Sequence, residues 1–172
     1  MGRRQSLFGF HLPAFCMLLA TLFILTGPAR AASTPMPDFS LVSAEDGSVL
    51  DSKTLKGKVL LINFFATWCP PCRQEIPDLI KFHDKYGPQG FMVIGISTDQ
   101  EGAQLLKKFI QKMKINYPVL MAAPNTPYDF GNIIGIPTNF LVDRSGQIVK
   151  RYDGYVDRDS LEQVIISLLT EK

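Results

Sequence analysis

The feature that most constrains this chain is an apolar run that ends just before a pair of cysteines. Residues 59–65 are apolar except for Asn63, and two residues later the sequence reads Trp68-Cys69-Pro70-Pro71-Cys72, followed by a helical pattern. A near-continuous apolar run of this length predicts a strand in a mostly parallel sheet that is covered on both faces. The cysteine pair therefore falls where a buried strand passes into a helix.

This position favours thiol chemistry at Cys69. A helix N-terminus presents unpaired N–H groups and the positive end of the helix dipole, and both stabilise a thiolate. The thiolate is the species that attacks a disulfide, so we predict Cys69 as the nucleophile and Cys72, one turn inside the helix, as the resolving cysteine. Pro70 and Pro71 have no N–H group, which leaves mainly the Cys72 amide to donate to the Cys69 sulfur. We therefore expect moderate activation and a dithiol that gives electrons away rather than a strong oxidant.

The first 31 residues have the pattern of a secretory signal peptide. They contain two arginines near the N-terminus, an uncharged apolar stretch over residues 12–26, and Ala29-Arg30-Ala31 before the expected cleavage point. The alternative is an uncleaved N-terminal membrane anchor, although the apolar run is shorter than a full bilayer span. Both interpretations predict a periplasmic or otherwise extracytoplasmic domain, and they differ in whether this segment anchors it to the membrane.

Removal of residues 1–31 would also remove Cys16 and would leave only the two cysteines of the motif. A disulfide framework for stability is then excluded. The first 31 residues hold three of the 18 Lys and Arg residues and none of the 16 Asp and Glu residues, so the other 141 residues carry 15 basic and 16 acidic side chains. Because there is no basic run, we expect no nucleic acid partner.

The rest of the chain alternates between strand and helix patterns. Residues 32–37, with Ser, Thr and two prolines, predict a flexible lead-in to a domain over residues 38–172. In the last helix, Asp159 is the expected cap, with Glu162 three positions on. This order predicts an α/β, three-layer domain with helices on both faces of a mixed sheet. The predicted elements are a hairpin over 39–42 and 48–50, a helix over 69–86, a strand over 91–97, a helix over 101–114, a short strand over 117–121, and a hairpin over 138–143 and 147–152.

Residues 63–77 closely resemble the TlpA/ResA-like family of thioredoxin-fold thiol-disulfide oxidoreductases, because they read NFFATWCPPCRQEIP. The segment Gly135-Ile136-Pro137-Thr138 supports the resemblance independently. The resemblance covers about residues 36–170, including an N-terminal β-hairpin extension and a central βα insertion before Gly135. It implies a thioredoxin-like three-layer fold and a protein disulfide oxidoreductase. We expect no cofactor and no metal.

The resemblance also implies a carboxylate that serves the cysteine pair. In thioredoxins proper a buried aspartate stands six residues before the first cysteine, where this chain has Asn63. The resemblance places the replacement at Glu75, about one helical turn beyond Cys72. A carboxylate there could accept the Cys72 proton as Cys72 attacks a mixed disulfide. The alternative is a surface glutamate, whose replacement by glutamine would leave exchange rates unaffected.

Substrate contacts are implied on the other side of the cysteines. The resemblance makes Pro137 a cis proline that holds the backbone of Ile136 beside the dithiol, so that an extended substrate segment can pair with it. An ordinary trans proline at the start of a strand is the alternative. We assign Trp68, Pro70 and Pro71 to the same contact surface, with a core position for Trp68 as the alternative.

The function predicted from these features is an exported thiol-disulfide oxidoreductase, a reductant of disulfides in specific extracytoplasmic proteins. The resemblance implies substrates such as apocytochrome c or copper-site proteins, and a membrane thiol-disulfide electron donor that restores the dithiol. We expect a monomer. The alternatives are a copper-binding chaperone, which in related proteins uses a CxxxC spacing and a distant histidine, and a general disulfide isomerase or oxidase. We expect Arg73 to be solvated and His83 to be a surface or packing residue, too far along the helix to act as a base.

Overall fold

The structure is a computed structural model that describes residue 2 and residues 34–171. The predicted signal peptide or anchor lies outside the described residues. Within the described part of the chain, no helix is both long and apolar enough to cross a membrane. The strands are β1 Thr34–Pro35, β2 Ser40–Val42, β3 Val49–Asp51, β4 Val59–Phe65, β5 Phe91–Ser97, β6 Val119–Met121, β7 Thr138–Val142 and β8 Gln147–Asp153, and the helices are η2 Ser52–Leu55, α2 Pro70–Tyr86, η3 Gly87–Gln89, α3 Ala103–Met113, α4 Thr126–Asp129 and α5 Arg158–Thr170.

Six of these strands form a mixed sheet in the order β1-β8-β7-β4-β5-β6, and β2 and β3 form a separate hairpin. β4 lies in the middle, parallel to β5 and antiparallel to β7, and all seven of its residues are buried. The predicted strands over 59–65 and 91–97 are confirmed with the same bounds. The central position of β4 explains its apolar sequence, since strands buried on both faces need apolar side chains in both directions.

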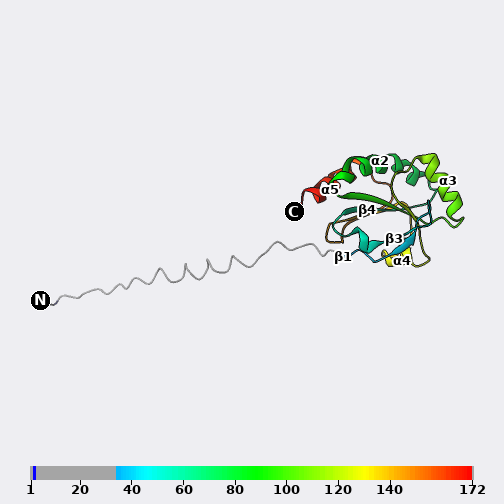
Figure 1. The fold of residues 1–172 in the computed structure, drawn as a ribbon. Coiled ribbons are helices and arrows are strands. Elements are labelled where there is room, and N and C mark those ends of the chain that lie inside the picture. Colours follow the sequence, from blue (N-terminus) through cyan, green and yellow to red (C-terminus); the bar gives the residue numbers. More distant parts are fainter. Residues whose placement is uncertain (1, 3–33, 172) are drawn as a thin grey trace. The chain divides into compact units, whose positions relative to one another are not determined.

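Alternate residues of β4 pack against different layers. Leu61 and Phe65 belong to the core cluster shared with α2, α3 and α5. Ile62 and Phe64 belong to the cluster shared with β2, η2 and the segment after α4. Figure 1 shows the three longer helices on one side of the sheet and β3 with α4 on the other. The predicted three-layer arrangement is confirmed, but the second face is covered mainly by the N-terminal hairpin and two short helical turns.

The first described residues differ from the expected flexible lead-in. Thr34 and Pro35 form the edge strand β1, which pairs antiparallel with Ile148 and Gln147 of β8. The next residue, Met36, donates its amide N–H to the carbonyl of Gly146 at 2.9 Å. An edge strand tolerates proline, because the missing N–H group on its outer side has no partner to lose. The assignment of residues 32–37 to a flexible lead-in is therefore wrong for residues 34–36.

The cap of the last helix also differs from the prediction. α5 begins at Arg158, and the side chain of Asp157 accepts hydrogen bonds from the Ser160 amide at 2.9 Å and the Ser160 hydroxyl at 2.6 Å. The expected cap, Asp159, lies inside the first turn. Both aspartates precede helical residues at suitable spacing, and Asp157 caps the helix because its backbone is extended, as a capping residue requires.

Candidate active site

The N-terminus of α2 carries the cysteine pair. Cys69 is the residue that caps the helix, and Pro70 and Pro71 occupy its first two positions. The Cys72 amide donates to the Cys69 sulfur at 3.3 Å. Cys69 and Cys72 form a disulfide with an S–S distance of 2.11 Å. The predicted single amide donor at the Cys69 sulfur therefore matches the geometry, because the two prolines have no N–H group to add.

The surroundings of the disulfide are exposed although the sulfurs are not. Cys69 is 3% exposed and Cys72 is 1% exposed. Trp68 is 64% exposed, and Pro70 and Pro71 are also exposed. The alternative that places Trp68 in the core is therefore wrong. The indole of Trp68 is exposed apolar surface, whereas Cys69, the next residue, is almost fully covered.

The loop before β7 lies against the disulfide from the other side. The peptide bond between Ile136 and Pro137 is cis, so the trans alternative is wrong. The carbonyl oxygen of Ile136 is 3.8 Å from the Cys69 sulfur. Pro137 is buried and Ile136 is half-buried, and β7 begins only at Thr138. The structure thus brings together the motif cysteines and the Ile136 backbone from segments more than 60 residues apart.

Glu75 lies on α2, one turn beyond Cys72, and is only 2% exposed. The alternative that makes it a surface glutamate is therefore wrong. Its carboxylate accepts hydrogen bonds from the Asn63 side chain at 3.3 Å, from the Asn139 side chain at 3.1 and 3.3 Å, and from the Val156 amide at 2.9 Å. Residues from β4, α2, β7 and the loop before α5 meet at this one carboxylate.

Burial raises the pKa of Glu75 above its usual range, because the ionised carboxylate loses its hydration. The hydrogen bonds from Asn139, Val156 and Asn63 act in the opposite direction, because N–H donors favour the charged form. Burial has the larger effect. Glu75 is thus a buried carboxyl group with a raised pKa that lies one helical turn from Cys72.

Asp99 organises the backbone before the cysteines and was not predicted from the sequence. Its carboxylate accepts from the Thr67 amide at 2.9 Å, from the Thr67 hydroxyl at 2.7 Å and from the Ser97 hydroxyl at 2.6 Å. Asp99 follows β5, and Thr67 lies two residues before Cys69. Because neighbouring parallel strands end at the same edge, the loops after β4 and β5 can be joined in this way. An aspartate two residues after the end of a buried strand was the available signal.

We predict that Asp99→Ala loosens this loop. The variant leaves two Thr67 donors without their partner, so we expect a loss of about 1–3 kcal/mol in the free energy of unfolding. We also expect the rate of attack by Cys69 on a small disulfide to fall by about threefold to tenfold, since small displacements of a reacting group slow a reaction. Urea unfolding and stopped-flow exchange test both effects. Asp129→Ala, a change at an exposed residue of α4, is the control and should alter neither.

Two other helix residues are placed as expected. Arg73 is exposed. His83 lies on α2 and is half-buried, and its Nδ1 accepts a hydrogen bond from the Val93 amide at 3.3 Å. This contact makes His83 a packing residue between α2 and β5. Burial lowers the pKa of His83, so its neutral form is the one that suits this hydrogen bond.

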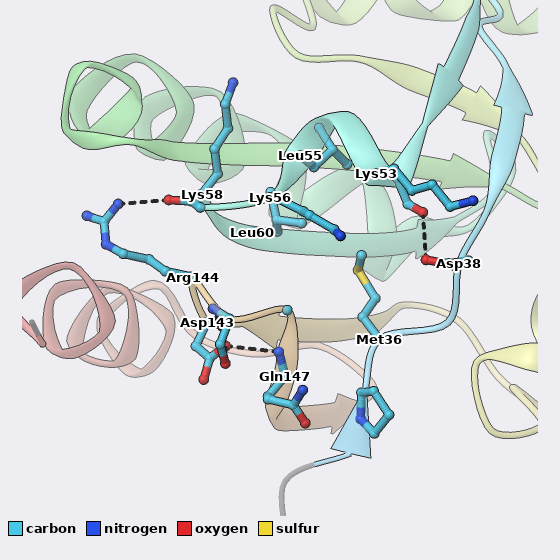
Figure 2. Close-up of a pocket in the computed structure, with 15 residues that line it drawn as sticks. Met36, Asp38, Lys53, Leu55, Lys56, Lys58, Leu60, Asp143, Arg144 and Gln147 are labelled. Atoms are coloured by element: carbon cyan, nitrogen blue, oxygen red, sulfur yellow. Dashed lines mark hydrogen bonds between the residues drawn. The ribbon is translucent and has the colours of Figure 1, made fainter.

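A separate cavity of about 340 Å³ lies at the other end of β4 (Figure 2). Its lining includes Met36, Leu60 and Arg144, and none of the predicted redox residues. In Figure 2 the side chains of Lys53 and Lys58 point in different directions, so these cations do not converge on one point. Within residues 34–171, no group of three or more His, Cys, Asp or Glu side chains is placed to hold a metal ion.

Comparisons with known proteins agree with this geometry. The Redoxin family model matches residues 31–165. This chain belongs to the Redoxin family. It is 31% identical over 130 residues to the thioredoxin-like protein YneN of Bacillus subtilis, and the match covers 74% of each chain. It is 28% identical over 129 residues to the thiol-disulfide oxidoreductase ResA of Bacillus thuringiensis subsp. konkukian, which covers 75% of this chain and 73% of ResA.

Solved structures give the same result for this Redoxin-family chain. A thiol:disulfide interchange protein of the thioredoxin family from Chlorobium tepidum superposes with a TM-score of 0.74 at 38% identity, covering 82% of this chain and 99% of that one. A thiol:disulfide interchange protein DsbE from the same organism superposes with a TM-score of 0.74 at 31% identity, covering 80% and 96%. The chain is a thioredoxin-like protein disulfide oxidoreductase of the ResA/TlpA-like type.

Proposed function

We propose that this oxidoreductase is exported and reduces disulfides in a restricted set of extracytoplasmic proteins through the Cys69–Cys72 dithiol. The observation that carries the proposal is the single amide donor at the Cys69 sulfur, from Cys72 at 3.3 Å. With one donor instead of three, the thiolate is stabilised only moderately. A weakly stabilised reduced form favours a protein that gives its electrons to a substrate disulfide.

The proposed reaction has two exchange steps. The Cys69 thiolate attacks one sulfur of the substrate disulfide, which forms a mixed disulfide and releases the other substrate sulfur as a thiolate. Cys72 then gives its proton to Glu75 and attacks the Cys69 sulfur. This step forms the Cys69–Cys72 disulfide and releases the second substrate thiolate, so two electrons have passed from the dithiol to the substrate. A membrane thiol-disulfide electron donor restores the dithiol.

The substrate surface is proposed on both sides of the Cys69 sulfur. The Ile136 carbonyl, 3.8 Å away, is in a position to accept a main-chain hydrogen bond from an extended substrate segment. Trp68, Pro70 and Pro71 provide exposed apolar surface on the other side. Apocytochrome c and copper-site proteins fit this proposal as substrates, because both need reduced cysteine pairs before they receive their metal or haem.

Export is supported by the sequence of residues 1–31, either as a cleaved signal peptide or as a membrane anchor. A periplasmic or other extracytoplasmic compartment permits substrate disulfides to form. We propose a monomer that needs no cofactor and no metal.

Trapping of mixed disulfides tests the proposed function. Cys72→Ser, expressed in the source cell and quenched with acid, should hold substrates covalently on Cys69, because the resolving sulfur is absent. We expect a small set of partners that reductant releases, with apocytochrome c or copper-site cysteines among them. Cys69→Ser is the control and should hold none. A broad set of secreted proteins bound to Cys69 would instead indicate a general oxidase or isomerase. The absence of any covalently bound protein would contradict disulfide exchange with protein substrates.

A further inference from the structure

Two buried asparagines stand opposite each other beneath the candidate active site. Asn63 in β4 pairs in register with Asn139 in β7. Asn63 is 1% exposed and Asn139 is 0% exposed. All residues of β4 and of β7 are buried, so both polar side chains lie inside fully buried strands. An amide at such a position costs free energy unless its donors and acceptor are satisfied. The hydrogen bonds of these two side chains therefore indicate what they serve.

The two amides form a connected circuit around Glu75. The Asn63 Nδ2 donates to the Asn139 Oδ1 at 2.8 Å and to the Glu75 Oε2 at 3.3 Å. The Asn139 Nδ2 donates to the Glu75 Oε2 at 3.1 Å and Oε1 at 3.3 Å. Because the Asn139 Oδ1 accepts the hydrogen bond from Asn63, the Asn139 Nδ2 faces the Glu75 carboxylate. Each asparagine thus fixes the other in the orientation that presents N–H groups to Glu75.

We infer that Asn63 and Asn139 act as one positioning unit that holds the Glu75 carboxylate ionised and correctly oriented to receive the Cys72 proton. This inference rests on the proposed role of Glu75 as proton acceptor. It adds the two residues whose N–H groups hold the Glu75 carboxylate in place. A carboxyl group that burial keeps protonated cannot accept a proton. The side-chain N–H groups offset part of the effect of that burial, because they hydrogen-bond more strongly to the ionised carboxylate than to the protonated carboxyl group.

A purely structural role makes a different prediction. Two asparagines that merely satisfied each other across the strands would need only the 2.8 Å bond between Asn63 and Asn139. Their remaining donors are aimed at one carboxylate. Loss of a structural pair would slow exchange equally at every pH through general loosening. Loss of a positioning unit would slow only the resolving step, and only where Glu75 becomes protonated.

The groups that titrate around Glu75 are few. Tyr117 is buried, and both its burial and the negative charge of Glu75 raise its pKa, so it remains a neutral phenol. The Cys72 thiol precedes Glu75 by one turn on α2. From the loop before α5, Asp157 turns its carboxylate to Ser160. From β4 and β7 only the neutral amides face Glu75. A pH profile of the resolving step therefore reports on Glu75 and the two cysteines.

The test follows both exchange steps with a chromogenic aromatic disulfide. Reduced protein releases one coloured thiol when Cys69 attacks and a second when Cys72 resolves, so the two steps appear as separate phases. For Asn139→Leu we expect the second phase to slow by about tenfold in mildly acidic buffer and by less than about twofold in mildly alkaline buffer, with the first phase unchanged. Carbon-13 NMR of the Glu75 carboxyl should show its titration midpoint moved to higher pH.

Two further variants keep the test decisive. Asn139→Asp keeps the shape and the acceptor for Asn63 but removes the donor to Glu75, and should show the same acid-selective slowing if Asn139→Leu fails to fold. Asn116→Leu removes an exposed asparagine that donates to Asp84 at 2.7 Å, and should leave both phases unchanged. Equal slowing of Asn139→Leu at every pH, or no slowing with an unmoved NMR titration, would overturn the inference.

Glu75→Gln separates this inference from the proposed function. If Glu75→Gln slows the second phase and the Asn139 variants do not, the positioning unit is wrong while the role of Glu75 stands. If Glu75→Gln leaves the second phase unchanged at every pH, the role of Glu75 itself is wrong, and the inference falls with it.

Discussion

Reduced protein with Cys72→Ser is expected to release one thiol from an aromatic disulfide where the wild type releases two. Cys69 caps α2 and receives the only amide hydrogen bond at its sulfur, so it is the cysteine that should form the attacking thiolate. Cys69→Ser should therefore slow the first release by on the order of 10³-fold or more and abolish the second, because Cys72 then has no partner cysteine to resolve it. Stopped-flow absorbance on matched reduced samples measures both phases.

The control for this pair is the same assay on wild type whose disulfide has been left oxidised, which should release no thiol. The opposite pattern would contradict the account. If Cys69→Ser kept a fast first release and Cys72→Ser lost it, Cys72 would be the nucleophile and the position of Cys69 at the helix N-terminus would not decide reactivity.

Glu75→Gln is expected to slow the resolving step by about 10²-fold near neutral pH and to leave the first step unchanged. Glutamine keeps the size of the side chain but cannot take up a proton. Glu101→Gln, at an exposed position, is the matched control and should leave both phases as in the wild type. A second phase of wild-type rate in Glu75→Gln would contradict the role of this carboxylate.

The same variant should change how stability depends on pH. The pKa of Glu75 is raised in the folded protein from its ordinary value of 4.5, so the unfolded chain loses this proton at lower pH than the folded protein does. The contribution of Glu75 to stability is thus complete below 4.5 and is lost as the pH rises through the folded pKa. Melting temperatures of the oxidised wild type should fall across that window more than those of Glu75→Gln. Parallel curves would contradict this expectation.

Much of the fold could be predicted because its strongest signals are local. The strands over 59–65 and 91–97 and the helix that ends at Tyr86 follow from apolar runs and a terminal Gly-Pro pair, and the structure has them at those positions. The structure of the lead-in over residues 34–36 was missed because its partner strand, β8, lies more than 100 residues away in the sequence, and the cap of α5 was missed because two local signals competed. Asp157 and Asp159 both suit a cap, and only the backbone conformation decides between them.

The surroundings of Glu75 could not be predicted in the same way. The position of the carboxylate followed from the resemblance, but its donors come from β4, β7 and the loop before α5. Asn139 and the Val156 amide lie 64 and 81 residues from Glu75 in the sequence. Only the register of β4 against β7 brings the two asparagines together. The one available signal was Asn63, a polar amide inside the otherwise apolar strand β4. This signal does not indicate which residue the amide contacts.

The measurement that tests the central claim most directly is the midpoint potential of the Cys69–Cys72 pair, from equilibration with defined glutathione or dithiol buffers. Pro70 and Pro71 have no backbone N–H group to donate to the Cys69 sulfur. Hydrogen bonds therefore stabilise the thiolate of the reduced form only weakly. We predict a reducing midpoint, closer to about −270 mV, as for thioredoxin, than to the oxidising end of the range. A midpoint near about −120 mV would contradict it and would make the protein an oxidant.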